Sequence, residues 1–420
     1  MRRPGKGTMT AALVVIVDGC NESYVTPTEM PFVHGLKQEG SYVGMASIPT
    51  FDQGLALFTG RSPRSTDTFV AFCLAPHPAP MARLLWSRLP LGLHTGRLQI
   101  GWALSLLQTV RSGARSRVTG VSLLTALHYA LTKTWVDLGC IPLALLPYLS
   151  VDRSIRLSQR KGRKGSHEHL FGMLKSQGFD VHFIYDSSEA VTRRMMLARK
   201  HSKRPVVWIL HYGDSDKIGH QFGPSSENLK SALRAIDLSI QTIHELVADE
   251  IDFLVLVSDH GMVEVQHTFD LWRELQGLDA RLFEDYIVFL NSPLARFWFR
   301  TNGAEIEIRK LLDRLDVYGR VVSAEERAAR DLPTDSRYGD LIFWTQPGVS
   351  IWPNFYHQHP VRGMHTYFDH EDIVPFLLCH RQKDLALAGP AALTDVTPTI
   401  LDLLGIPIPS VDGRSVLVRS

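Results

Sequence analysis

Three aspartates and three histidines of this sequence lie beside apolar runs, and both residue types are common metal ligands. The six candidates are Asp18, Asp216, His220, Asp259, His260 and His365. Asp18 ends the run VVIVD, whereas Asp259 and His260 end the run FLVLVSDH. Any one of them has an ordinary structural explanation, because Asp followed by Gly is a common turn and single histidines are usually structural. As a set, they indicate a metal site.

The spacing of these residues supports shared ligation. Asp216 and His220 lie four positions apart in GDSDKIGH, so a helical turn would place both on one face. Asp259 and His260 are neighbours, and both can reach one ion only if the chain turns at Gly261. Mixed carboxylate and imidazole ligation suits zinc, or manganese as a harder alternative, and disfavours calcium. Six ligands are enough for two divalent ions.

Alternating strand and helix patterns would bring these side chains together. Apolar runs at 180–186, 206–212, 253–259 and 373–380 predict buried strands, in addition to the first run described above. Between them, the segment 225–250 carries Leu and Ile at helical spacing and predicts an amphipathic helix. This order predicts an α/β fold with a doubly wound, mostly parallel sheet flanked by helices. Ligands of such sheets bind beyond the carboxyl ends of the strands.

Length and composition favour a large globular core. The 420 residues are 45% hydrophobic, and the net charge of +2 from 45 basic and 43 acidic residues predicts no binding of polymeric nucleic acid. The four cysteines are widely spaced, which favours a reducing, cytoplasmic compartment over a disulfide framework or a zinc ribbon. The apolar run near the N-terminus fits a buried strand better than a signal peptide, and no run reaches the roughly 20 apolar residues of a transmembrane helix.

Five motifs together resemble those of the alkaline phosphatase superfamily, and most of all its type I phosphodiesterase and nucleotide pyrophosphatase family. The motifs are VVIVDGC, the segment PTFDQGLALFTG around Thr50, DKIGHQFGP, VSDHGM and GMHTYFD. The resemblance covers most of residues 11–60 and 165–415 and implies an alkaline-phosphatase-like fold. The catalytic domain would then comprise residues 9–60 and 166–418, with an insert at residues 61–165.

The resemblance also implies a role for each candidate ligand. One divalent ion would be held by Asp216, His220 and His365, and the other by Asp18, Asp259 and His260. The Thr50 hydroxyl would also be a ligand of the second ion and act as the nucleophile, forming a phosphothreonine intermediate. Zn²⁺ is the expected metal, with Mn²⁺ as the alternative.

Two features depart from the family pattern. Gln53 stands where nucleotide pyrophosphatases usually carry an asparagine that holds a phosphoryl oxygen; its amide can still donate, so Gln53 is a candidate substrate-binding residue. The segment HYGDSDKIGH is closer to the lipid-acting phosphoethanolamine transferases of glycolipid-anchor synthesis. A sulfatase is not expected, because it needs a cysteine or serine precursor where this chain has Thr50.

The insert at residues 61–165 differs in charge from the rest of the chain. It carries 15 basic and 3 acidic residues, whereas the remainder carries 30 basic and 40 acidic residues. Its apolar runs predict a helical cap that packs over the sheet. Two functional interpretations compete with this one: its arginines could attract an anionic phosphodiester, or its basic helices could contact an anionic membrane peripherally.

These observations predict an enzyme, a metal-dependent hydrolase that cleaves a phosphodiester or phosphoanhydride in a nucleotide or a lipid-like substrate. Two alternatives stay open. One is a phosphomonoesterase or a phosphoryl-group transferase that acts on a lipid-like substrate with the same site. The other is an inactive protein that only binds a phosphorylated ligand. The complete ligand set argues against the inactive protein, whereas the replacement of the family's asparagine by Gln53 keeps this alternative open.

Overall fold

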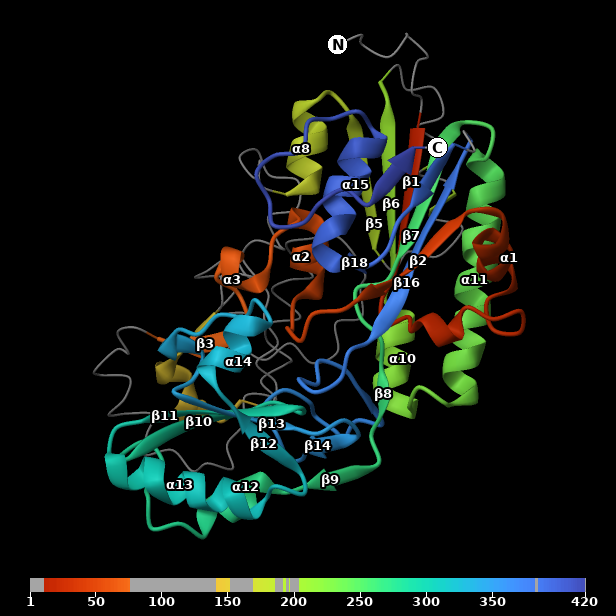
Figure 1. The fold of residues 1–420 in the computed structure, drawn as a ribbon. Helices are drawn as coiled ribbons and strands as arrows, with labels where there is room; N and C mark the ends of the chain where they lie inside the picture. Colours follow the sequence, from red (N-terminus) through yellow and green to blue (C-terminus); the bar gives the residue numbers. More distant parts are fainter. Residues whose placement is uncertain are drawn as a thin grey trace, which may run out of the picture.

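A seven-stranded sheet forms the centre of the molecule (Figure 1). The structure is a computed structural model, and it describes residues 11–75, 141–151, 169–185, 192–193, 196, 204–381 and 384–419. The strands of the sheet are β1 (Ala11–Val17), β2 (Ser41–Ala46), β5 (Asp180–Tyr185), β6 (Val206–Tyr212), β7 (Ile251–Val257), β16 (Ile373–His380) and β18 (Ala391–Ala392). They lie in the order β18-β2-β16-β7-β1-β6-β5.

The register of this sheet aligns the ends of three parallel strands. β1 pairs in parallel with β6 and β7, and Val17 lies opposite Tyr212. Ile16 lies opposite Val257, the last residue of β7. β16 runs antiparallel between β7 and β2, so its first residues lie at the edge where β1, β6 and β7 end. This direction brings His365, which precedes β16, toward the same edge as the residues that follow the other strands.

Helices cover both faces of the sheet, as the sequence predicts for a doubly wound fold. One face is covered by α1 (Pro31–Glu39) and α11 (Glu227–Val247), and the other by α2 (Gln53–Thr59), α8 (Leu170–Ser176) and α15 (Val396–Leu403) (Figure 1). Alternate side chains of β1 enter two separate cores, which explains its continuous apolar run. The apolar positions of α11 are buried as their spacing predicts: Leu229, Leu233, Ile236, Ile240 and Ile243.

A second sheet, which the sequence analysis did not predict, has four antiparallel strands. They are β10 (Tyr286–Leu290), β11 (Leu294–Phe299), β12 (Gly319–Val322) and β13 (Leu341–Thr345), in the order β10-β11-β13-β12. This sheet lies below the large one in Figure 1 and is accompanied by α12 (Leu271–Gln276), α13 (Asn302–Arg314) and α14 (Ala324–Ala329). Its apolar side chains form a core of their own.

Short elements lie around and between the two sheets. β8 (Val263–Glu264) pairs with β15 (Gly363–Met364), and β9 (His267–Phe269) pairs with β14 (Val349–Ile351). Beside the large sheet, β17 (Leu385–Leu387) pairs with β19 (Leu417–Arg419). Other helical segments of the described residues are α10 (Asp214–Phe222) and the 3-10 turns η1 (Glu22–Tyr24), η3 (Ser336–Tyr338) and η4 (Leu393–Asp395).

Two segments of the insert, 61–75 and 141–151, belong to the described part of the chain. They form α3 (Pro63–Thr66), the paired strands β3 (Phe72–Leu74) and β4 (Leu149–Val151), and the 3-10 segment η2 (Leu143–Tyr148). Phe72, Leu145 and Tyr148 join the core of the four-stranded sheet. The bulk of the predicted helical cap, at residues 76–140 and 152–165, lies outside the described residues. Among the described helices, none is long and apolar enough to cross a membrane.

Candidate metal centre

The six predicted ligands converge where β1, β6 and β7 end. Asp18 directly follows β1, and Asp259 and His260 follow β7. α10 begins one residue after β6 and carries the remaining aspartate and one histidine. His365 directly follows β15, whose pairing with β8 places it beside the segment that leaves β7. The direction of the strands thus gathers side chains from four separate parts of the sequence.

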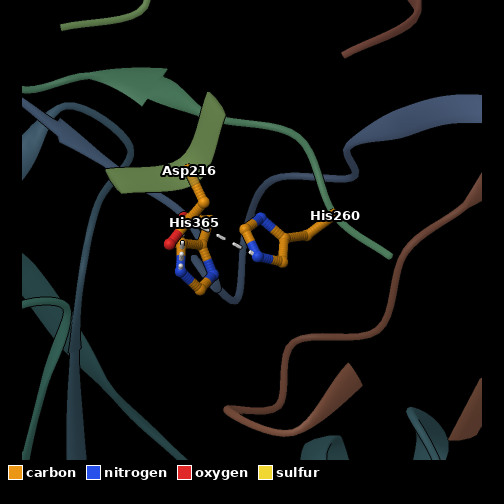
Figure 2. Close-up of side chains that lie close together, drawn as sticks. All are labelled: Asp216, His260 and His365. Atoms are coloured by element: carbon orange, nitrogen blue, oxygen red, sulfur yellow. Dashed lines mark ion pairs between the residues drawn. The ribbon is translucent and has the colours of Figure 1, made fainter. Parts of the chain in front are cut away.

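Ligand atoms of these residues form two overlapping groups, and within each group all atoms lie within 4.8 Å of one another. One group is Asp18, Asp259 and His260; the other is Asp216, His260 and His365 (Figure 2). His260 Nε2 belongs to both, because it lies 3.1 Å from Asp18 Oδ1 and 3.9 Å from Asp216 Oδ1. It also lies 4.0 Å from Asp259 Oδ1. The two groups are therefore adjacent.

His220 adjoins the second group through Asp216. Its Nε2 atom lies 3.2 Å from Asp216 Oδ1, the i,i+4 contact that the sequence spacing predicts. The imidazole of His365 stacks on that of His260, with ring centroids 3.7 Å apart and an angle of 14° between the planes. The resemblance assigned Asp216, His220 and His365 to one ion. In the structure the group around Asp216 contains His260 and His365, with His220 next to it.

The other nitrogen of each imidazole is held by a protein oxygen. Nδ1 of His220 lies 2.8 Å from Gly363 O, and Nδ1 of His260 lies 2.8 Å from Gly261 O. A carbonyl oxygen only accepts, so Nδ1 carries the hydrogen in both rings. In a neutral imidazole this leaves the lone pair on Nε2, which faces the aspartates. Such orientation of ligating histidines is typical of metal sites.

The charges of the first group are strongly coupled. Burial, followed by the negative charge of Asp259, raises the pKa of Asp18 to about 7. Burial opposes a charge on His260, but Asp259 and Asp18 nevertheless hold the pKa of His260 well above 6.5. Without an ion, these buried groups retain a proton to balance the carboxylates. A divalent cation would replace that proton.

In the second group, Asp216 and His365 have the protonation states that suit ligation. Although burial opposes it, the charge of His220 lowers the pKa of Asp216 below its ordinary range. Burial, and then the charge of His260, lowers the pKa of His365 well below its ordinary value. Oδ1 of Asp216 is buried and lies 3.2 Å from Nε2 of His220 and 3.9 Å from Nε2 of both His260 and His365. An ionised buried oxygen beside the neutral imidazole of His365 fits a divalent cation such as zinc, which would replace the protons of the neighbouring imidazoles.

Thr50 and Gln53 lie at the start of the segment that leads into α2. Thr50 is 1% exposed, and its hydroxyl donates to Phe69 O at 2.9 Å. Gln53, the first residue of α2, is also buried, and its Nε2 donates to Thr366 Oγ1 at 3.1 Å and to Ile48 O at 3.4 Å. Both amide hydrogens of Gln53 are therefore directed at protein oxygens in the structure.

Two further histidines near the site were missed by the sequence analysis. Nε2 of His211 lies 3.4 Å from Asp18 Oδ2, and its ring stacks on the half-exposed Tyr185 at 4.6 Å. His211 is the penultimate residue of a predicted strand. Its position near the carboxyl end of that strand could have marked it as a residue of the site. The ring of His357 lies 5.4 Å from that of His220, and burial lowers the pKa of His357 to about 3. No sequence pattern marks His357, which lies in a loop.

Comparisons with known proteins identify relatives of this chain. The chain is 36% identical over 88 residues to GPI ethanolamine phosphate transferase 2 of Kluyveromyces lactis, covering 20% of this chain and 11% of that protein. It is 24% identical over 207 residues to an ectonucleotide pyrophosphatase/phosphodiesterase of Caenorhabditis elegans, covering 47% of this chain and 24% of that protein. The chain thus spans a quarter or less of these two relatives.

Solved structures share the fold over nearly the whole chain. An inactive variant of murine ectonucleotide pyrophosphatase/phosphodiesterase 5 in complex with AMP superposes with a TM-score of 0.62 at 16% identity, covering 96% of this chain and 97% of that one. The human counterpart superposes with a TM-score of 0.62 at 17% identity, covering 96% of both chains. A family model described as type I phosphodiesterase / nucleotide pyrophosphatase matches residues 134–368, more than half of the chain. The chain therefore belongs to the type I phosphodiesterase and nucleotide pyrophosphatase family of the alkaline phosphatase superfamily.

Proposed function

We propose that this protein is a metal-dependent hydrolase that cleaves phosphodiesters or phosphoanhydrides through a covalent intermediate on Thr50. The observation that carries the proposal is the pair of Asp and His groups that share His260 at the carboxyl edge of the sheet. Family membership supports the same class of reaction. The AMP bound to the murine relative supports a nucleotide as the substrate, although the identity to that protein is low.

Two divalent ions fit the donor atoms of the site. Carboxylate oxygens and imidazole nitrogens together favour Zn²⁺, with Mn²⁺ as the alternative. When bound, such ions would neutralise charge on a phosphoryl group and lower the pKa of a hydroxyl beside them. One ion would be held by Asp18, Asp259 and His260, and the other by Asp216 and His365 with His220 adjoining.

The residues of the chain would then carry out two displacements at phosphorus. First, Thr50 Oγ bonds to phosphorus as the bond to the leaving oxygen breaks, and the hydroxyl proton ends on the leaving group. Next, the oxygen of a water bonds to phosphorus as the bond to Thr50 Oγ breaks, and a proton of that water returns to Thr50. In the structure the hydroxyl donates to Phe69 O, so it turns away from this carbonyl to react.

A second candidate function is transfer of the phosphoryl-containing group to an acceptor other than water. The observation that favours it is the 36% identity to a GPI ethanolamine phosphate transferase over 88 residues. An alcohol of a lipid-like acceptor would then take the place of water in the second displacement. Peripheral contact of the basic insert with an anionic membrane would suit such an acceptor.

An activity screen separates these functions. Zinc-loaded protein is assayed with bis-p-nitrophenyl phosphate, a nucleoside diphosphate, p-nitrophenyl phosphate and a lysophospholipid, with and without a lipid alcohol. We expect turnover of a diester or anhydride that a chelator abolishes and added zinc restores. Turnover of the monoester alone would assign a phosphomonoesterase, and turnover that requires the lipid alcohol would assign a transferase. Full activity after chelation would rule out the metal-dependent mechanism.

A further inference from the structure

The hydroxyl of Thr366 connects three parts of the candidate site. It lies 2.7 Å from Nδ1 of His365, accepts a hydrogen bond from Gln53 Nε2 at 3.1 Å and donates to Thr50 O at 3.3 Å. Thr366 is 3% exposed, and Gln53 is equally buried. One buried hydroxyl thus contacts a candidate metal ligand, the residue that carries the candidate nucleophile, and the first turn of α2.

The donors and acceptors of this hydroxyl determine the tautomer of His365. A hydroxyl has one hydrogen to donate and two lone pairs to accept with. All three contacts are hydrogen bonds in one arrangement: the hydroxyl hydrogen goes to Thr50 O, because a carbonyl oxygen only accepts, and one lone pair takes the amide hydrogen of Gln53. In that arrangement the remaining lone pair accepts from Nδ1 of His365. The free lone pair of the neutral ring then lies on Nε2, 3.9 Å from Asp216 Oδ1.

The backbone of Thr366 is unusual for its residue type. Its φ angle is +67°, in the left-handed region that β-branched residues rarely adopt because of steric crowding. Trp344 Nε1 donates to Thr366 O at 2.8 Å and helps to hold this conformation. Glycine would adopt the same angle without steric cost. A threonine here therefore suggests that its hydroxyl, rather than its backbone, is what the site uses.

We propose that Gln53 and Thr366 act as a pair of positioning residues: through the Thr366 hydroxyl they fix His365 as an Nε2 ligand and hold it against the Thr50 backbone. The proposal rests on the proposed metal centre. It gives Gln53 a role different from the one suggested by sequence position, since one amide hydrogen supports a metal ligand through Thr366 and the other goes to Ile48 O rather than to a phosphoryl oxygen. Removing either member should loosen the metal centre without removing a ligand atom.

Substitutions of Thr366 separate this role from a structural one. Thr366→Gly removes the hydroxyl and also relieves the positive φ angle, so the fold is expected to keep a melting temperature near that of the wild type. Zinc affinity is expected to fall by about 10- to 100-fold, the usual effect of losing an outer-shell partner. Thr366→Ser keeps the hydroxyl and should restore affinity. Gln53→Met removes the amide donor and should also lower zinc affinity.

The matched control is Thr397→Ala. Thr397 is also a buried threonine. It lies on α15, and its hydroxyl donates to Leu57 O of α2 at 2.7 Å. This variant should lower the melting temperature and leave zinc affinity unchanged. A double variant of Gln53→Met and Thr366→Gly should lose little more affinity than Thr366→Gly alone, because the two residues act through one hydroxyl.

The experiment is a chelator-competition measurement of zinc affinity on the full chain, combined with ¹⁵N NMR of the imidazoles. The wild type should show the Nδ1–H tautomer of His365 in metal-free protein, and Thr366→Gly should lose this preference. If the wild type binds zinc and Thr366→Gly binds it equally with the same tautomer, the positioning role is overturned and the metal centre stands. If the wild type binds no zinc, the proposed metal centre is overturned, and the positioning role with it.

Discussion

A single hydroxyl carries the covalent step of the proposed reaction. Thr50 is buried, and its Oγ atom is held by Phe69 O in the structure. Thr50→Ala removes the nucleophile, whereas the Asp and His donors all remain. We expect kcat for bis-p-nitrophenyl phosphate to fall by at least about a thousandfold, because the alternative direct attack by water lacks a positioned nucleophile. Zinc content, measured by elemental analysis, should stay at the wild-type value.

The matched control for this substitution is Thr50→Ser, which keeps Oγ and loses only a methyl group. It should retain most of the activity. With bis-p-nitrophenyl phosphate as the substrate, acid-quenched samples examined by mass spectrometry should carry a p-nitrophenyl phosphoryl group at position 50 in the wild type and in the serine variant, and none in Thr50→Ala. Turnover by Thr50→Ala at a rate similar to that of the wild type would place the nucleophile on another residue.

At the level of single residues, type and spacing predicted which side chains gather, and three-dimensional contacts determined what they touch. The i,i+4 contact of Asp216 with His220 follows from helical geometry and was predictable. The sharing of His260 by two groups was not, because it depends on ring orientation. The contact of Gln53 with Thr366 joins residues 313 positions apart, so no local pattern could indicate it.

At the level of elements, the strands of the long apolar runs and the mostly parallel sheet were predicted well, whereas the direction of β16 was not. β6 and β16 have the predicted bounds of 206–212 and 373–380, and the helix predicted at 225–250 is α11 at 227–247. The antiparallel direction of β16 is set by its neighbours, which the run itself does not reveal. The four-stranded sheet was missed because runs of four to six buried residues have no diagnostic period, and their pairing is not local.

The start of α1 gives a test of such a non-local contact. Met30 at the N-cap offers no side-chain hydrogen bond, and Pro31 occupies the first helical position. The carboxylate of Asp237, on α11, accepts from Phe32 N and Val33 N at 2.9 Å each. Asp237→Ala leaves these donors unpaired and should reduce the free energy of unfolding by about 1–3 kcal/mol, as measured by urea denaturation.

Two variants calibrate that measurement. Burial raises the pKa of Asp237, so replacing its charge by a neutral amide is tolerated better than removing the acceptor. Asp237→Asn should therefore be less destabilised than Asp237→Ala. Asp249 is exposed just beyond the end of the same helix, and Asp249→Ala should unfold like the wild type. Equal stability of Asp237→Ala and the wild type would show that α1 begins without this cap.

At the level of the whole molecule, two sheets with separate cores lie beside one site, whose ligands come from distant parts of the chain. The six candidate ligands lie at the edge of the seven-stranded sheet, and the four-stranded sheet packs against the described segments of the insert, 61–75 and 141–151. The fold was predictable because five motifs together resemble one superfamily. The superposition on the murine structure, which covers 96% of this chain, confirms that fold. The division into residues 9–60, 166–418 and an insert at 61–165 stays a prediction.

Ligands drawn from distant segments should couple metal binding to global stability. Asp18 lies near the start of the chain and His365 near its end, so the site joins distant segments. Without an ion, the negative charges of Asp259 and Asp216 repel that of Asp18. A cation that binds only the folded state stabilises it by about 4 kcal/mol when its concentration is a thousand times its dissociation constant. A chelator should therefore lower the melting temperature, and added zinc should restore it.

The shared residue His260 makes this prediction specific to the site. His260→Ala removes a donor from both groups, so its melting temperature should respond little to either chelator or zinc. His267→Ala replaces an exposed histidine of β9 and should respond like the wild type. If both variants were stabilised by zinc to the same extent, the ion would bind elsewhere on the molecule, and the coupling between this site and the global fold would have to be abandoned.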